Sequence, residues 1–134
     1  MKRIVIILAF FLSALSGFAQ NAENIDIYNR RFTIEEGTGA NWHTYRTKRL
    51  WGNVRVVTDP NEHADLRVHI VNYGGLRILN INAVEKAVDW DQWHWVYRKG
   101  EEDFTIRIVE DYWDISVRIV SGYNPKTKRT ERGK

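Results

Sequence analysis

The sequence predicts an all-β fold in which short tandem strands are wound into a solenoid-like single domain with at most one short helix. Two observations carry this prediction. Between Gly52 and Tyr123 the chain has short alternating runs of β-branched residues, each ended within a few positions by Asp, Asn, Gly or Pro. Three of these runs also repeat one pattern of Asp, apolar, polar, apolar, polar, apolar, Val. A short repeat of this kind is typical of a β winding rather than of a helical solenoid.

The alternating runs predict six strands and one shared interior. The strands are expected over residues 54–57, 66–71, 76–81, 93–97, 104–109 and 115–120. Three of them follow directly on Asp65, Asp103 and Asp114 and carry the repeated pattern. Because side chains alternate between the two faces of a strand, the apolar positions of the three copies are expected to form the core. These positions are Leu66, Val68, Ile70, Phe104, Ile106, Ile108, Ile115, Val117 and Ile119.

Outside the repeats less structure is expected. Two short strands are predicted at 25–28 and 31–34, followed by a polar, glycine-containing loop. Residues 83–88 contain neither Gly nor Pro and follow Asn82, which is suited to N-capping, so a helix of a turn or two is expected there. The tail at 125–134 is expected to be disordered.

The amino terminus has the order of a cleavable secretion signal. Lys2 and Arg3 are followed by an unbroken apolar run over 4–12 and then by small residues that end at Ala19. The apolar run is shorter than the roughly 20 residues that a membrane-spanning helix needs. We therefore expect cleavage after Ala19 and an exported mature protein, periplasmic or extracellular, that does not span a membrane.

This pattern divides the chain into four expected segments. They are a signal peptide at 1–19, an N-terminal extension at 20–49, a β-repeat domain at 50–124 and a basic tail at 125–134.

Charge and cysteine content narrow the function classes. Of 20 Lys and Arg residues, two lie in the signal segment, which leaves 18 against 17 Asp and Glu. A domain with this balance is not expected to bind nucleic acid. There is no cysteine, so an exported domain of this size must be stabilised by burial or topology rather than by disulfides. The basic charge is concentrated near the end, where five basic residues stand against Glu131 alone: Lys126, Lys128, Arg129, Arg132 and Lys134.

Several strings resemble a known family. LWGNVRVV, ADLRVHIV, WHWV, EDFTIRIV and WDISVRIVSGYNP are similar to the valine-rich strands of the septoil knot, a small exported bacterial domain. The resemblance covers residues 50–124, and the WHWV strand lies where that family has its odd Trp-containing strand. It departs at the turns, where only the aspartates of the family pattern are retained. The resemblance implies a torus knot of seven crossings and no established activity.

The aromatic strand offers a candidate binding surface. Trp93, Trp95 and Tyr97 alternate along one face of a predicted strand. Such a face can stack on sugar rings, and this would make the protein a carbohydrate-binding module. Alternatively the same face fills the core, which is the interpretation we favour, because large aromatics bury area that a small cysteine-free domain needs.

No motif indicates catalysis, and we expect neither enzymatic activity nor a cofactor or metal. His43, His63, His69 and His94 lack the spacing of metal ligands. The mature serines lie outside any nucleophile-elbow motif. The acidic residues around 89–91 and 101–103 are expected to be solvated turns rather than a glycosidase pair or a calcium site.

One arginine recurs in nearly every predicted strand, on the face away from the core. This row could bind anions. It could equally be a charged exterior that keeps strands from aggregating, and the acidic neighbours favour this second interpretation. The residues are Arg55, Arg67, Arg77, Arg107 and Arg118.

The sequence as a whole predicts an exported, non-enzymatic binding or structural module of the bacterial cell envelope. Slow unfolding would protect such a domain from extracellular proteases. Its partner would be an envelope polysaccharide or a protein. The alternative is the carbohydrate-binding module with the aromatic face at Trp93, Trp95 and Tyr97.

Overall fold

The computed structural model describes residues 22–40 and 42–133, and this part of the chain forms ten strands and no helix. No helix that could span a membrane is therefore found among these residues. The predicted signal peptide at 1–19 lies outside them. The strands are β1 (Ala22–Asp26), β2 (Arg31–Thr38), β3 (His43–Arg49), β4 (Gly52–Val56), β5 (Leu66–Val71), β6 (Ile78–Ala83), β7 (Gln92–Val96), β8 (Phe104–Ile108), β9 (Ile115–Asn124) and β10 (Arg129–Glu131).

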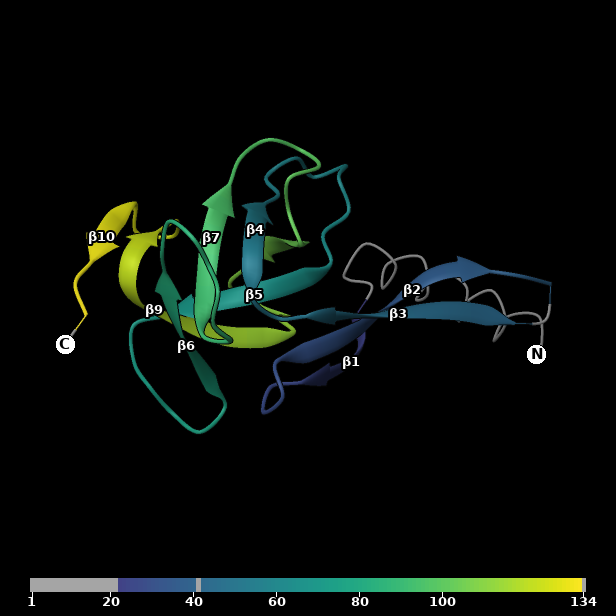
Figure 1. The fold of residues 1–134 in the computed structure, drawn as a ribbon, viewed down its shortest axis with the longest axis horizontal. Helices are drawn as coiled ribbons and strands as arrows, with labels where there is room; N and C mark the ends of the chain where they lie inside the picture. The colour runs from purple at the N-terminus through teal and green to yellow at the C-terminus, as the bar shows by residue number, and fades with distance from the viewer. Residues whose placement is uncertain (1–21, 41, 134) are drawn as a thin grey trace, which may run out of the picture.

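Strands β4 to β9 form a closed barrel in which every neighbouring pair is parallel (Figure 1). Around the barrel the order is β4, β8, β5, β9, β6 and β7, and the pairing of β7 with β4 completes the circle. The interior is filled by alternate side chains, as in other small barrels. In β5, for example, Leu66, Val68 and Ile70 are buried, whereas Arg67 and His69 are only partly so.

The predicted solenoid-like winding is wrong, because strands that are neighbours in the chain are mostly not neighbours in space. Among the six barrel strands, only β6 and β7 are adjacent both in the chain and in the sheet. In each of the other consecutive pairs of barrel strands, the two strands are separated in the barrel by one strand from elsewhere in the chain. The sheet therefore closes on itself instead of extending as a tandem stack, and this pairing lends no support to the knot that the resemblance implied.

The strands themselves were predicted well, since all six expected runs coincide with β4 to β9 to within a few residues. Eight of the nine expected core residues are buried, and Ile108 is partly buried against them. Alternation with a period of two decides which side chains point inward, whatever the order of the strands.

The repeated aspartates link the strands at their beginnings. Each aspartate precedes its own strand and accepts a hydrogen bond from a backbone N–H near the start of the next strand around the barrel. Asp65 and Thr105 do so reciprocally, because the Thr105 hydroxyl accepts from the Asp65 N–H at 2.9 Å. The donors are Arg67 N to Asp114 at 2.7 Å, Thr105 N to Asp65 at 3.0 Å and Asn53 N to Asp103 at 2.7 Å. The repeat thus marks three equivalent joints of a barrel.

The first three strands form a separate antiparallel sheet in the order β1, β2, β3, which projects from one end of the barrel (Figure 1). Its base belongs to the barrel core. Phe32 is buried edge-on against Phe104, with ring centroids 5.5 Å apart. The carbonyl of buried Leu50 accepts a hydrogen bond from the Trp93 indole at 3.1 Å. β3 occupies residues that we expected to be loop, because it completes a hairpin with β2.

Two further expectations are wrong for local reasons. Residues 83–88 are not helical: β6 continues to Ala83, and the Asn82 side chain hydrogen-bonds Asp91 and Ser121 instead of capping a helix. The tail is not disordered through residue 133, because β10 pairs with the end of β9. The buried Asn124 side chain accepts hydrogen bonds from the Lys126 and Thr127 N–H groups and so shapes this turn.

Candidate functional site

Two of the three residues of the expected aromatic face, Trp93 and Trp95, belong to the barrel interior. Trp93 is fully buried and Trp95 is 9% exposed, and their rings meet edge-on at 5.8 Å. The Trp95 indole donates to the Tyr123 carbonyl at 2.8 Å. Tyr97 lies just past the end of β7 and is 81% exposed. The two tryptophans therefore cannot form a platform with Tyr97. The core interpretation fits Trp93 and Trp95 but not Tyr97, which lies outside the core.

Arg55, in the expected row of arginines, is a buried structural residue. Its Nη2 donates to Glu62 at 2.6 Å and its Nε donates to Glu102 at 3.0 Å. These hydrogen bonds raise the pKa of Arg55 above its usual value and lower the pKa of Glu62. Burial works to raise the pKa of Glu102, but the hydrogen bonds from Arg55 and the backbone hold that pKa below its usual value. This cluster ties β4 to the two loops that cross it.

The other arginines of the row differ from one another. Arg67 lies 4.0 Å from Asp114, and Arg107 donates to the carbonyls of Asp59 and Glu62. Arg77 is exposed in the turn before β6. Arg118 points outward from β9, and none of the described residues forms an ion pair with it. The row is therefore not a continuous anion-binding stripe.

Arg118 lines a groove of about 760 Å³ on the outer surface of the barrel. One wall comes from the loop after β5, the floor comes from β6 and β9, and the other wall is the hairpin of β9 and β10 with the residues after it. These elements lie at the end of the molecule away from the β1–β3 sheet (Figure 1). The polar and aromatic lining includes Asn72, Tyr73, Asn80, Arg118, Thr127 and Arg132.

The frame of the groove is held by internal hydrogen bonds. The Ser121 hydroxyl donates to the Asn82 side chain at 2.7 Å, and Asn82 donates to Asp91 at 3.2 Å. On the hairpin, the Asn124 amide donates to Glu131 at 3.1 Å. Lys126 donates to the Ile70 carbonyl at 2.9 Å and so fastens the hairpin to β5. The hairpin is thus a fixed wall, which favours a preformed site.

Other side chains of the lining are not used by the fold. Within the described ranges, Asn72, Asn80, Arg118 and Arg132 form no side-chain hydrogen bond or ion pair, although they line the groove. Asn80 and Arg118 are in register on the paired strands β6 and β9. Tyr73 is 58% exposed. Amide, guanidinium and phenol groups therefore face a common space with donors and acceptors to spare.

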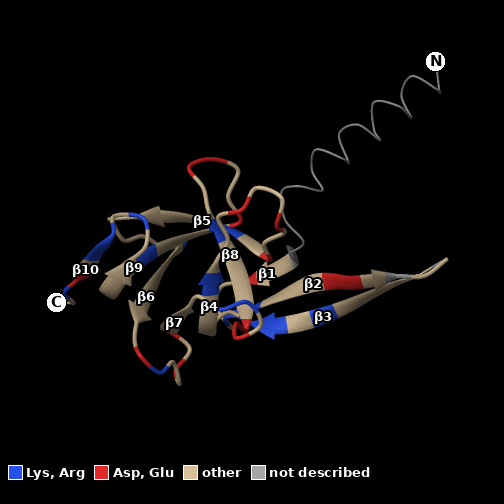
Figure 2. Ribbon diagram, turned by 90° about the horizontal axis from the view of Figure 1, so that it is seen from above, with Lys and Arg blue, Asp and Glu red and all other residues tan. Residues whose placement is uncertain are grey.

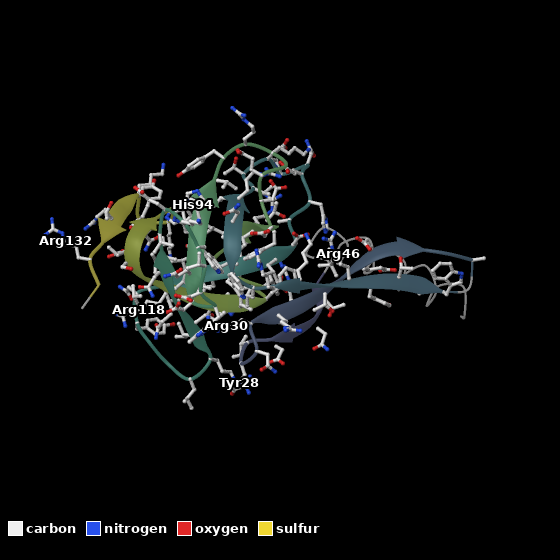
Figure 3. All side chains as sticks on the ribbon, in the orientation of Figure 1. Tyr28, Arg30, Arg46, His94, Arg118 and Arg132 are labelled. Atoms are coloured by element: carbon white, nitrogen blue, oxygen red, sulfur yellow. The ribbon has the colours of Figure 1, made fainter. Side chains whose placement is uncertain are left out.

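The groove is more basic than the rest of the barrel. Figure 2 shows Lys and Arg, in blue, on β10 and on the turn that precedes it. Figure 3 places Arg118 and Arg132 on the same flank of the molecule, the first beside β9 and the second beyond β10. A Cβ added at Gly74 would lie 3.6 Å from Arg118 Nη1, so the guanidinium rests beside the loop that follows β5.

Sequence patterns singled out Arg118 and the basic tail, but not the groove that joins them. Its residues come from four segments, and only the strand order brings β5, β6 and β9 together. One available signal was the pair of outward asparagines in β6, Asn80 and Asn82, because polar amides at alternate positions distinguish this strand from the valine-rich ones.

The candidate catalytic groups remain dispersed. His69 stacks on Trp113 at 4.0 Å, His94 hydrogen-bonds the Val84 carbonyl at 2.9 Å, and His43 pairs with Glu35. His63 is exposed in the loop before β5. Among residues 22–40 and 42–133, no three His, Cys, Asp or Glu residues are grouped to hold a metal ion. Among the acidic residues at 89–91 and 101–103, Asp91 accepts from the Asn82 amide, Glu102 from Arg55 and Asp103 from the Asn53 N–H.

Comparison with models of known protein families, with curated proteins and with solved structures returned no significant match.

Proposed function

We propose that the protein is an exported, non-enzymatic binding module of the bacterial cell envelope, and that the groove beside β9 is its binding site. One observation carries the proposal: a rigidly framed groove is lined by polar side chains that the fold itself leaves without partners. Because exposed polar side chains of this kind give a pocket its specificity, the groove is the surface best suited to bind.

A polysaccharide of the envelope is the ligand that the lining favours. Sugar rings present hydroxyl groups that both donate and accept hydrogen bonds, and the amides of Asn72 and Asn80 do the same. Tyr73 adds an exposed aromatic ring, which can pack against the apolar face of a sugar. A carbohydrate-binding function thus belongs to the groove rather than to Trp93, Trp95 and Tyr97.

The envelope location rests on the sequence of residues 1–19. The resemblance to the septoil knot family also supports export, because the members of that family are exported bacterial domains. It does not suggest an activity, because none is established for that family. If the signal is cleaved, the protein recovered from bacterial culture begins at Gln20, which amino-terminal sequencing would establish. A protein that retains Met1 and stays in the cytoplasm would contradict this part of the proposal.

A glycan array followed by calorimetric titration tests the binding function. The variant Asn72→Ala/Asn80→Ala removes two uncommitted amides from the groove and no internal hydrogen bond, so it is expected to fold normally and to lose binding. The control Tyr97→Ala removes an exposed aromatic outside the groove and is expected to bind like the wild type. Equal binding by wild type and the double variant would exclude the groove as the site.

A further inference from the structure

We propose that the ligand of the groove is an acidic saccharide whose anionic group, a carboxylate or a sulfate or phosphate ester, is bound by Arg118. This inference rests on the proposed function and names the class of ligand. Its starting point is that the described part of the groove contains more cationic groups than the fold neutralises.

The charges that line the groove can be assigned one by one. Lys126 lies 3.2 Å from Glu110 and donates to the Ile70 carbonyl. Glu131, the acidic residue of the lining, accepts from the Asn124 amide. Arg118 and Arg132 are also among the lining residues, and neither forms an ion pair with the residues that the structure describes. A ligand in the groove therefore meets an excess of positive charge.

The repeat shows that Arg118 is the exception among equivalent residues. In the three copies of the pattern, the fifth position is occupied by His69, Arg107 and Arg118. Each of the first two is covered by a crossing loop. His69 stacks on Trp113, and Arg107 donates to the carbonyls of Asp59 and Glu62. At Arg118 the groove takes the place of such a loop, so the partner that the other two find within the chain is missing here.

The neighbours of Arg118 suit a saccharide. On β9 it is in register with Val71 of β5 on one side and with Asn80 of β6 on the other. A guanidinium presents paired N–H donors that match carboxylate, sulfate or phosphate oxygens. The Asn80 amide beside it can hydrogen-bond a ring hydroxyl of the same sugar unit, and Arg132 on the opposite wall can meet the charge of a second unit.

Titration of the purified protein with a matched pair of oligosaccharides tests the proposal. Oligogalacturonate carries one carboxylate per sugar, and its methyl ester has the same backbone without charge. The acid form is expected to bind at least about tenfold more tightly than the ester, since a charged acceptor forms the stronger hydrogen bonds with guanidinium. A sulfated and a phosphorylated oligosaccharide distinguish which anion is preferred.

Three variants assign the effect to Arg118. Arg118→Gln is expected to lose about tenfold in affinity for the acid form and nothing for the ester, and Arg118→Lys should recover only part of the loss because it lacks the planar fork. Arg77→Gln removes an exposed arginine outside the groove and is the control. If Arg77→Gln weakens binding as much as Arg118→Gln, the attraction is non-specific and the proposal is wrong.

The outcomes separate this proposal from the function on which it rests. If acid and ester bind equally and Asn72→Ala/Asn80→Ala abolishes both, the groove binds saccharides but the requirement for charge is wrong. If no saccharide binds, the proposed function fails as well. Polyglutamate serves as an acidic polypeptide, and binding as tight as that of oligogalacturonate would show that the partner is a protein rather than a sugar.

Discussion

Asp114 shows what a repeated residue contributes at the scale of a single side chain. It is 8% exposed and accepts the Arg67 N–H at 2.7 Å, and burial raises its pKa against the opposing effects of that hydrogen bond and of the Arg67 charge. Replacement by Ala removes the acceptor and leaves a backbone donor without its partner.

We therefore expect Asp114→Ala to lower the free energy of unfolding by about 1–3 kcal/mol. Asp114→Asn should lose less than half as much, since the amide oxygen can still accept and the buried charge is gone. Urea unfolding at neutral pH measures both variants. Equal losses in the two would show that the charge, and not the hydrogen bond to Arg67, holds this joint.

The tryptophans give a second prediction at this scale. Trp93 is fully buried in contact with Phe104, so Trp93→Ala is expected to cost about 3–5 kcal/mol of stability. Tyr97→Ala should change the free energy of unfolding by less than about 0.5 kcal/mol, as is usual for exposed positions. Thermal and urea unfolding measure the difference, and a stable, well-folded Trp93→Ala variant would contradict the packing of the barrel core.

The period-two pattern predicted which residues share a face, but it could not predict which face is buried when both carry large side chains. For Leu66, Val68 and Ile70 the alternative face holds Arg67 and His69, so the answer follows from polarity. For Trp93 and Trp95 the sequence left a surface platform open, and only the position of β7 within a closed barrel decides the matter.

At the scale of elements, the cluster of Arg55, Glu62 and Glu102 makes the attachment of two loops to β4 sensitive to acid. The pKa values of both carboxyls are held below the usual 4.5 in the folded protein. A group with a depressed folded pKa contributes its stability above the unfolded pKa and loses it as the pH falls through the folded value. The loops should therefore loosen below about pH 4.5.

The double variant Glu62→Gln/Glu102→Gln tests this sign. At pH 7 it should be less stable than the wild type, and the two curves of unfolding free energy against pH should converge as the pH is lowered toward 3. Glu85→Gln alters an exposed glutamate between β6 and β7 and should follow the wild type throughout. Parallel curves for wild type and the double variant would show that these carboxylates do not contribute through ionisation.

The end of β9 contains a glycine, Gly122, at which a side chain would be both strained and crowded. Gly122 has a φ of 86°, and a Cβ there would lie 2.0 Å from the backbone oxygen of Ala83 on the paired strand. Gly100 also has a positive φ, of 100°, but a Cβ would meet nothing within 4 Å. Substitutions at Gly100 and Gly122 therefore distinguish the cost of backbone strain, which both share, from the cost of a steric clash, which only Gly122 has.

We expect Gly100→Ala to cost about 1–2 kcal/mol from strain alone. Gly122→Ala should cost at least about 1 kcal/mol more, because β6 and β9 must move apart to accept the methyl group. Chemical denaturation measures both, and the groove should bind its ligand more weakly in the second variant only. Equal losses of unfolding free energy in the two variants would show that β6 can move away from the added methyl group without destabilising the fold.

Elements outside the repeats were harder to predict, because their structure depends on partners rather than on local pattern. Residues 83–88 have the composition of a short helix, yet Ala83 is paired with Trp93 in a parallel ladder. The tail has few apolar residues, and it is ordered by the pairing of Arg129 with Asn124 and by the hydrogen bonds of the Asn124 side chain. Neither partner can be identified from the sequence of the segment itself.

At the scale of the whole molecule, the sequence favoured a tandem winding because three runs repeat one pattern at a short interval, and it did not predict a closed circle of parallel strands joined by short loops. The connections 72–77 and 109–114 show why such joining is possible here. Six extended residues reach about 20 Å, whereas a strand of five residues rises about 17 Å. A loop of this length is therefore long enough to return along the barrel and enter the next parallel strand, and alternation alone cannot distinguish this path from a solenoid.

The closed parallel barrel also predicts slow unfolding. Within the barrel, every pair of hydrogen-bonded strands except β6 and β7 joins strands that are not consecutive in the chain, and β6 closes the circle by pairing with β9. Such an arrangement has no free barrel edge from which strands can peel away one at a time, and its many non-local pairings are slow both to form and to lose. Resistance to proteases would then come from the slow rate of unfolding rather than from the equilibrium stability.

We expect the unfolding rate constant, extrapolated to water from denaturant jumps, to be about 10⁻⁵ s⁻¹ or lower. Limited digestion should cut the β1–β3 sheet, which projects from the barrel, long before the barrel itself. Phe32→Ala provides a contrast, because it loosens the base of that sheet against Phe104 while leaving the pairing of β6 with β9 intact. Phe32→Ala should lower the free energy of unfolding by more than it lowers the activation free energy for unfolding of the barrel. Digestion of barrel and sheet at the same rate would mean that closure of the circle does not slow unfolding.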